Sequence, residues 1–353
     1  MKPNEARNRM TPKAPKSPPT PLTELAILTE IRRRSAKTRS SAVRLGIGDD
    51  CAILRPRPGE EIVVTTDLSL EGRHFRLDWH PPEAVGHRAL ARGLSDLAAM
   101  GARPLAAFLS LAVPPELTIA QHQGTSWTMR FMNGLFALAK AHQVPLAGGD
   151  LAQSSYPVAD IVLVGAVPQE RALLRTGAVP GDLLYVTGKL GGAAAGLRIL
   201  AEIHAGTGAI PSQYAEALKP HLYPKPRLGQ GRWLRPRATA ALDISDGLST
   251  DLAHLCKESG VAAEVDASAL PIHPGATLEN ALHGGEDYEL LFTAAPETKI
   301  AKSIAGVPVT KIGQILPEKT GHKKAGRPQV TLQTASGPVP LHPNGWQHFK
   351  KQP

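Results

Sequence analysis

Short strands that run into glycine and acidic residues recur along the 353-residue chain, and they limit the folds that it can adopt. The β-branched segment 62–67 ends in Thr-Thr-Asp, 144–150 ends in Gly-Gly-Asp, and the apolar segment 240–247 ends in Asp-Ile-Ser-Asp-Gly. Helical patterns occupy 82–101 and 248–259. Strands that alternate with helices predict an α/β fold. Because this pattern is present in both halves of the chain, we expect two related α/β layers. The two halves do not form a clean sequence repeat.

The other patterns divide the chain into a tail and two domains. Residues 1–22 are basic and rich in proline, which is typical of a disordered tail. We expect an N-terminal domain over 23–167 and a C-terminal domain over 168–353. Further elements are expected as helices over 23–34 and 118–142, strands over 105–113, 158–167, 182–188 and after the Gly-Gly-acid turn at 284–287, and a helix after Lys189 whose first amides are candidate phosphate ligands.

Composition and charge argue against several classes of protein. The net charge of +9 is concentrated in the tail and in the loop 317–328, and aromatic residues make up only 4% of the chain. Binding of nucleic acid by base stacking is therefore not expected. No apolar run approaches the roughly 18 residues of a membrane span, so we expect no membrane insertion and a cytoplasmic protein. Cys51 and Cys256 form no metal-binding pair, and we expect both to be buried packing residues.

The acidic residues are too many and too regularly placed for turns alone. Gly46–Asp50 reads Gly-Ile-Gly-Asp-Asp, which suits either a surface turn or a metal ligand. Asp96 lies among small apolar residues of a predicted helix, so either Arg92 four residues earlier pairs with it or it joins a metal cluster. Carboxylates gathered at strand ends, without a His/Cys cluster, predict oxygen coordination of Mg²⁺ or Mn²⁺ and a nucleoside triphosphate site. The acids concerned are Asp49, Asp50, Asp67, Asp96, Asp150, Asp243 and Asp246.

Seven motifs, taken in order, carry a family resemblance that spans the chain except the tail. They are Gly46–Asp50, Thr65–Asp67, Glu71–Phe75, Leu94–Gly101, Gly148–Asp150, Asp243–Leu248 and Gly284–Leu290. Together they resemble the motifs of the thiamine-monophosphate kinase family, which belongs to the superfamily of aminoimidazole-ribonucleotide synthetase. The resemblance implies a two-domain α/β (α+β) fold of that superfamily. It also implies a homodimer whose N-terminal domains join their sheets in a β-barrel, each followed by a C-terminal α/β domain.

The resemblance further implies an activity and a set of site residues. The activity is transfer of the γ-phosphoryl group of ATP to thiamine monophosphate, which gives thiamine diphosphate, with Mg²⁺ and usually K⁺. The implied metal ligands are Asp50, Thr65, Thr66, Asp67, Asp96, Asp150, Asp243 and Asp246, of which Asp50, Asp96, Asp150, Asp243 and Asp246 are also the implied catalytic residues. The implied contacts to ATP are Gly149, Asp150, Arg175 and Ser245, and those to the thiamine end are His74, Glu286 and Trp346. Of the first acidic pair, we expect Asp50 to be the metal ligand and Asp49 to be either a turn residue or an acid that supports the ligands without binding the metal.

Other functions remain open at this point. Aminoimidazole-ribonucleotide synthetase, selenophosphate synthetase and the hydrogenase-maturation dehydratase share the ATP-binding half of the superfamily. Selenophosphate synthetase needs a reactive Cys or selenocysteine near its N-terminus, and this chain has no Cys before Gly46. The dehydratase ends in a reactive Cys, whereas this chain ends in Lys-Lys-Gln-Pro. A non-catalytic nucleotide-binding protein is a further alternative, although such a protein would not need every acid.

Overall fold

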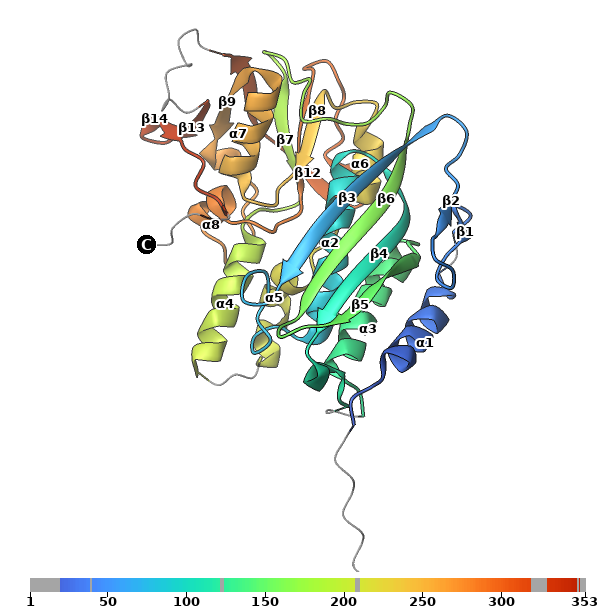
Figure 1. Cartoon of the computed structure of the whole chain (residues 1–353). Coiled ribbons are helices and arrows are strands. Elements are labelled where there is room, and N and C mark those ends of the chain that lie inside the picture. The colour runs from blue at the N-terminus through green and yellow to red at the C-terminus, as the bar shows by residue number, and fades with distance from the viewer. Residues whose placement is uncertain are drawn as a thin grey trace, which may run out of the picture.

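The computed structural model describes residues 20–38, 40–120, 124–206, 210–318, 329–347 and 349, so nearly all of the predicted tail lies outside the described residues. The chain forms two β-sheets with helices packed on and between them (Figure 1). The elements of the first half are α1 (Glu24–Ser35), β1 (Val43–Leu45), β2 (Ile53–Leu54), β3 (Glu60–Leu70), α2 (Pro82–Ala99), β4 (Arg103–Val113), a 3-10 turn (Pro115–Thr118), α3 (Trp127–Ala141), β5 (Leu146–Gln153) and β6 (Val158–Pro168).

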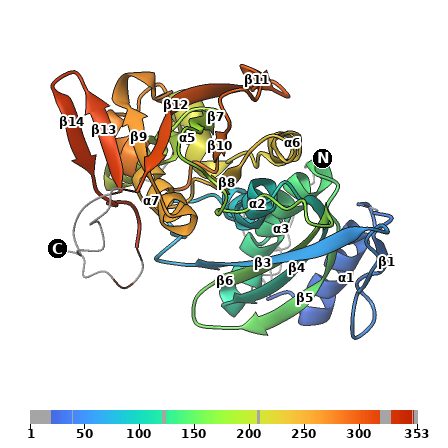
Figure 2. The same cartoon turned by 90° about the horizontal axis from the view of Figure 1, so that it is seen from above.

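The first sheet has four strands in the order β3-β6-β4-β5, and within the described residues it is open, not closed into a barrel. Strands β4 and β5 are parallel and the other pairs are antiparallel. Helices α2 and α3 cover one face of this sheet (Figure 2). On β3, the alternating residues Ile62, Val64 and Leu68 point to the other face and are 45%, 60% and 48% exposed. Among the residues that the structure describes, nothing covers this apolar strip of the sheet.

The second sheet has eight strands, with the path β14-β13-β9-β12-β7-β10-β8 and β11 paired beside β12. Every residue of β8 and β10 is buried, because helices and the first domain's helix α2 cover this end of the sheet. The elements of this half are β7 (Leu183–Thr187), α4 (Gly192–Gly206), α5 (Ala215–Leu222), α6 (Leu228–Leu234), β8 (Ala240–Asp243), α7 (Leu248–Ser259), β9 (Val261–Asp266), α8 (Leu278–His283), β10 (Leu290–Ala294), β11 (Ser303–Ile304), β12 (Val307–Pro317), β13 (Val330–Thr334) and β14 (Gly337–Leu341).

Helix α2 lies between the two sheets and belongs to the core of both halves. Its Leu90 and Leu94 are completely buried, in one apolar cluster with Ile161 of β6 and Phe292 of β10. The hydroxyl of Ser95 on the same helix donates a hydrogen bond of 2.6 Å to Asp243 at the end of β8. This shared core brings residues of both sheets to one place. The predicted division near residue 168 stays a prediction.

Helices α2 and α3 cross so closely that glycine is required at the contact. A Cβ atom at Gly86 would lie 1.9 Å from the carbonyl oxygen of Phe131. We expect Gly86→Ala to lower the free energy of unfolding by about 1–3 kcal/mol, since overpacking forces the helices apart. At Gly229 of α6 the nearest atom to such a Cβ is 3.9 Å away. Gly229→Ala should therefore raise the free energy of unfolding by up to about 1 kcal/mol, through helix propensity alone. Urea denaturation measures both, and wild-type stability of Gly86→Ala would contradict the close crossing.

Three predictions from the sequence were wrong in detail. The helix expected over 118–142 begins only at Trp127, where the hydroxyl of Ser126 accepts the N–H of Met129 and caps it. Gly148–Asp150 does not form a turn but lies within β5. Cys51 is exposed rather than buried, whereas Cys256 is buried, and burial raises the pKa of its thiol to about 12. In the described part of the chain, no helix has both the length and the apolar character needed to cross a membrane.

Candidate active site

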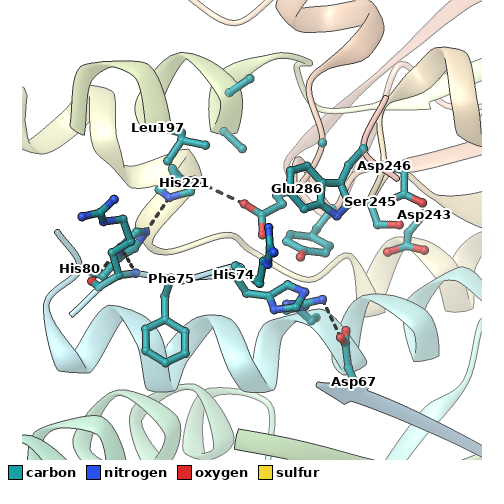
Figure 3. Close-up of a pocket in the computed structure, with 18 of the residues that line it drawn as sticks. Asp67, His74, Phe75, His80, Leu197, His221, Asp243, Ser245, Asp246 and Glu286 are labelled. Atoms are coloured by element: carbon teal, nitrogen blue, oxygen red, sulfur yellow. Dashed lines mark hydrogen bonds and ion pairs between the residues drawn. The ribbon is translucent and has the colours of Figure 1, made fainter. Parts of the chain in front are cut away.

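A pocket of about 770 Å³ opens between the two halves, and most of the predicted site residues line it. We call it the main pocket. Figure 3 shows acidic residues, with Asp67 and Asp243 among them, at one end, and His80 and Phe75 at the other. The predicted residues in its lining are Thr66, Asp67, His74, Asp96, Asp243, Ser245, Asp246, Glu286 and Trp346. Residues that are up to 280 positions apart in the sequence, from Thr66 to Trp346, thus share one pocket.

Three elements deliver the carboxylates of the acidic end. Asp67 is on β3, and its Oδ1 lies 2.7 Å from Nη2 of Arg92 on α2. Asp96, also on α2, accepts a hydrogen bond from the hydroxyl of Thr65. Asp243 ends β8. Arg92 therefore forms its ion pair with Asp67, and the alternative in which it pairs with Asp96 is wrong. The remaining Arg92 nitrogens, Nε and Nη1, are buried without a hydrogen-bond partner in the described structure.

Burial makes these carboxylates costly to ionise. It raises the pKa of Asp67 to about 6, although the charge of Arg92 acts in the opposite direction. It raises the pKa of Asp96 as well, and it raises that of Asp243 to about 7, where the charge of Asp96 adds to the effect. Carboxylates that raise one another's pKa become stable anions when a cation lies between them. The donor chemistry at this end therefore suits a hard divalent cation.

The same end is not yet arranged as a metal site in this conformation. Within the described ranges, no three His, Cys, Asp or Glu side chains are grouped closely enough to hold a metal ion. Arg92 forms an ion pair with Asp67. The hydroxyl of Ser95 donates a hydrogen bond to Asp243, and that of Thr65 donates one to Asp96. The residue types fit Mg²⁺, but binding it would require these contacts to rearrange.

The turn after β8 is held by a buried carboxylate that the sequence analysis did not single out. Oδ2 of Asp251, in the first turn of α7, accepts the N–H groups of Ser245, Asp246 and Gly247 at 3.1, 3.0 and 3.0 Å. A carboxylate is favourably placed at a helix N-terminus. No capping motif in the sequence indicated this role, because the capping box has its acid three residues after the N-cap and Asp251 lies four residues after Gly247. Asp251 therefore fixes the main chain that presents Ser245 and Asp246 to the main pocket.

A strained turn before β10 presents Glu286 to the main pocket, beside the turn that carries Ser245 and Asp246. Glu286 and Tyr288 have φ values of 68° and 51°, in the left-handed region that non-glycine residues rarely adopt. The turn is tied to the previous one, because the N–H of Glu286 donates to the carbonyl of Ser245 at 2.7 Å. Gly345 packs closely on the turn after β8, because a Cβ atom at Gly345 would lie 1.9 Å from the carbonyl oxygen of Asp246. Backbone strain of this kind is concentrated at functional sites.

The other end of the main pocket is built from aromatic and histidine side chains. It is lined by Phe75, Trp79, His80, Leu197 and His221. Nε2 of His80 lies 3.0 Å from Nε2 of His221, and burial lowers the pKa of His80 to about 4. The pKa of His221 is also lowered by burial, well below its ordinary value. Both rings are therefore neutral near pH 7. The charged side chains at this end include Glu286 and Arg76, whose Cζ lies 4.5 Å from the centroid of the Trp79 ring.

The other predicted residues lie elsewhere. Asp50, Gly149 and Asp150 line a second pocket of about 380 Å³ beside the edge strand β5, which we call the sheet-edge pocket. Asp49 lines it too, and its Oδ1 accepts the N–H of Asp50, a contact typical of a turn. In the strand register, Asp67 faces Ile161, Ile161 faces Leu109, and Leu109 faces Gly149. Three strand spacings separate the two pockets' residues, about 14 Å. One chain therefore does not bring all the predicted acids together.

Two further predicted site residues, Thr65 and Arg175, line neither pocket. The phosphate site predicted at the start of α4 is taken by a side chain of the protein itself. Thr65 binds Asp96, and Arg175 is exposed, although its charge opposes the burial that raises the pKa of Asp96 and Asp243. The first amides of α4 were candidate phosphate ligands. Instead, the N–H groups of Gly191 and Ala193 donate to Asp287 at 2.6 and 3.1 Å. That phosphate site is therefore wrong for this conformation.

With this geometry in place, known proteins can be compared with the chain. The family model described as AIR synthase related protein, N-terminal domain, matches residues 48–167, and the model of the corresponding C-terminal domain matches residues 179–323. The thiamine-monophosphate kinase of Escherichia coli K12 is 38% identical over 333 residues, which are 90% of this chain and 97% of that protein. The chain belongs to the thiamine-monophosphate kinase family. The family resemblance seen in the sequence motifs is thereby confirmed.

Other members of the thiamine-monophosphate kinase family give the same result. The Bacillus subtilis enzyme is 35% identical over 323 residues, covering 88% of this chain and 95% of that protein. The crystal structure of the enzyme from Stenotrophomonas maltophilia superposes with a TM-score of 0.73 at 38% identity, covering 84% of this chain and 95% of the other. The structure of AaThiL complexed with AMPPCP and TMP has a TM-score of 0.70 at 29% identity, covering 92% and 97%. The predicted mixed α/β fold of two AIR-synthetase-type domains is confirmed.

Proposed function

We propose that this chain transfers the γ-phosphoryl group of ATP to thiamine monophosphate and releases thiamine diphosphate and ADP. The observation that carries the proposal is the match along nearly the whole chain to AaThiL, which is complexed with AMPPCP and TMP. Thiamine-monophosphate kinases that are 38% and 35% identical over about nine-tenths of the chain add support. The main pocket, with an acidic end and an aromatic end, is chemically suited to a phosphate chain and a pair of heterocyclic rings.

The two ends of the main pocket suggest how the substrates are oriented. We place the phosphate groups at Asp67, Asp96, Asp243 and Asp246, with Ser245 beside them. The thiamine rings would occupy the end formed by the aromatic and histidine side chains, with His74, Glu286 and Trp346 as their polar and aromatic contacts. Trp346 is 42% exposed and lines the pocket, and an indole ring at this place suits contact with a flat ligand. Gly149, Asp150 and Arg175 are the other proposed contacts to ATP, although Gly149 and Asp150 line the sheet-edge pocket of the same chain and Arg175 lines neither pocket.

Mg²⁺ would be held by the acidic residues and by Thr65 and Thr66. When bound, it neutralises charge on the phosphate oxygens as phosphoryl transfer proceeds. The chain's own residues position the two phosphates. The acceptor phosphate has a second pKa near 6 and is largely a dianion at pH 7, so no strong general base is needed. The chief barrier is the repulsion between two anions brought into line, which positioning and charge neutralisation overcome. We propose direct transfer without a phosphorylated enzyme. The use of K⁺ and a cytoplasmic location stay predictions from the sequence.

We further propose that the chain acts as a homodimer with sites completed between two copies. The uncovered apolar strip of β3, formed by Ile62, Val64 and Leu68, supports an interface on this face, where the sheets of two copies would join in a barrel. The separation of the main pocket from the sheet-edge pocket supports a shared site. A second copy would supply its Asp50 and Asp150 to the main pocket of the first. The acids of the two pockets lie about 14 Å apart in one chain. They would meet in a single site for metal and triphosphate if each copy contributed one of the two pockets.

The direct test is ATP consumption that depends on thiamine monophosphate. Purified protein with Mg²⁺ and ATP is expected to form ADP and thiamine diphosphate in equal amounts, and only when the acceptor is added. With γ-labelled ATP and no acceptor, the protein should remain unlabelled. Formation of ADP with aminoimidazole-ribonucleotide precursors or selenide instead of thiamine monophosphate would assign the chain to another activity of the superfamily. Binding of ATP without turnover of any acceptor would favour a non-catalytic role.

A further inference from the structure

A buried arginine behind the main pocket connects the segments that carry two of the predicted thiamine contacts. Arg88 of α2 is 4% exposed and lies outside the pocket lining. Its Nη2 donates to Oε1 of Glu286 at 2.6 Å and to the carbonyl oxygen of His74 at 3.1 Å. Its Nη1 donates to the carbonyl oxygen of His221 at 2.5 Å. One guanidinium group thus joins the β3–α2 loop, the end of α5 and the strained turn before β10.

The carboxylate that pairs with Arg88 lines the main pocket and is carried by a strained turn, which an ion pair with a purely structural role would not require. Glu286 is 198 residues from Arg88 in sequence, lines the pocket, and is held on a turn with a left-handed backbone. Its Oε2 lies 3.6 Å from Nδ1 of His221. Burial acts to raise the pKa of Glu286, but the charge and hydrogen bond of Arg88, together with the charges of His221 and Arg92, outweigh it, and the pKa is lowered to about 2. A carboxylate oxygen has two lone pairs, so a single contact to Arg88 leaves acceptor capacity toward the pocket.

We propose that Arg88 is a positioning residue for recognition of the thiamine rings. It holds the Glu286 carboxylate and the main chain of His74 at the aromatic end of the main pocket, where Glu286 meets the cationic thiazolium ring or the amino group of the pyrimidine. This inference rests on the proposed function, because it names the group that orients a substrate contact. The planar guanidinium reaches three acceptors on three segments, which a lysine ammonium on a flexible stem cannot reproduce in one fixed geometry.

The proposal predicts a selective loss of acceptor binding. In Arg88→Gln the KM for thiamine monophosphate should rise at least about tenfold, the effect expected when a charge-assisted hydrogen bond that orients a ligand group is lost. The KM for ATP should stay within about twofold of wild type, because the triphosphate lies at the other end of the pocket. Arg88→Lys should give a smaller rise. Calorimetric titration with thiamine monophosphate, without ATP, should show the same order of dissociation constants and does not depend on turnover.

Two comparisons separate positioning from a general structural role. Arg130→Gln removes a comparable guanidinium, which pairs with Glu83 at 2.7 Å where α3 meets α2, outside the main pocket. It should leave both KM values unchanged. In a Glu286→Gln background, adding Arg88→Gln should raise the KM for thiamine monophosphate by less than it does in the wild type, because the part of its effect that acts through Glu286 is already lost.

The proposal is overturned by any of three results. These are a wild-type KM for thiamine monophosphate in Arg88→Gln, an equal rise of both KM values, or an undiminished effect of Arg88→Gln in the Glu286→Gln background. If Arg88→Gln does not fold, Arg88→Lys decides the question by the same split between the two KM values. Failure of the proposed function is a different result. In that case the wild-type protein itself shows neither binding nor phosphorylation of thiamine monophosphate.

Discussion

Asp243→Asn is expected to lower kcat for phosphorylation of thiamine monophosphate by about 100- to 1000-fold, the usual cost of removing a group that stabilises transition-state charge. Asp243 is 5% exposed and ends β8, and burial, with the charge of Asp96 adding to it, raises its pKa. Asparagine has nearly the same shape and can keep the hydrogen bond from Ser95, but it lacks the charge. The protein should therefore stay folded while it loses activity.

The measurement is steady-state kinetics together with a denaturation curve for each variant. Asp266→Asn is a control, because Asp266 ends β9, is exposed, accepts hydrogen bonds from the N–H and the hydroxyl of Ser268, and lines neither pocket. It should turn over at the wild-type rate. A folded Asp243→Asn variant with near-wild-type kcat would show that the acidic end of the main pocket is not the site of phosphoryl transfer.

Two inactive variants are expected to restore each other when their subunits are mixed in one dimer. Asp50 lines the sheet-edge pocket and Asp246 lines the main pocket. We expect Asp50→Asn and Asp246→Asn each to be nearly inactive alone. In a mixed dimer, the Asp50→Asn subunit keeps an intact main pocket and the Asp246→Asn subunit keeps an intact sheet-edge pocket. These two intact pockets meet at one of the two sites. Random mixing in equal amounts makes half of the dimers mixed, with one active site of two, which gives about a quarter of the wild-type activity.

The opposite pairing distinguishes a shared site from a site within one chain. Dimers of wild type with the double variant Asp50→Asn/Asp246→Asn should be inactive if the site is shared, because each site then contains one altered group. If each chain builds its own site, those dimers keep half of the wild-type activity and the first mixture stays inactive. Differently tagged subunits, co-expressed and purified as mixed dimers, give both measurements. A protein that remains monomeric at assay concentrations would contradict the dimer as well.

Local features of the fold could be predicted from the sequence because they depend on neighbouring residues. Thr23 precedes a helical pattern, and its hydroxyl accepts the N–H of Ala26 at the start of α1. The helix expected over 248–259 has those bounds in α7. Propensity and capping were not sufficient for α3, whose start depends on Ser126. Helices α5, α6 and α8 and most strands after residue 260 were not predicted, because no acidic motif marks their ends.

The site shows the same division. Motifs identified the chemical groups, and nine of the predicted residues do line one pocket. The sequence by itself determined which oxygen and aromatic groups are available and the family to which they belong. Only the tertiary structure decided their partners: Arg92 with Asp67, Asp251 with the turn at 245–247, and Arg88 with Glu286. It also placed Asp50 and Asp150 in a pocket apart from Asp67. The physical reason is that these contacts depend on strand register and on the packing of α2 between two sheets, and no local pattern encodes either.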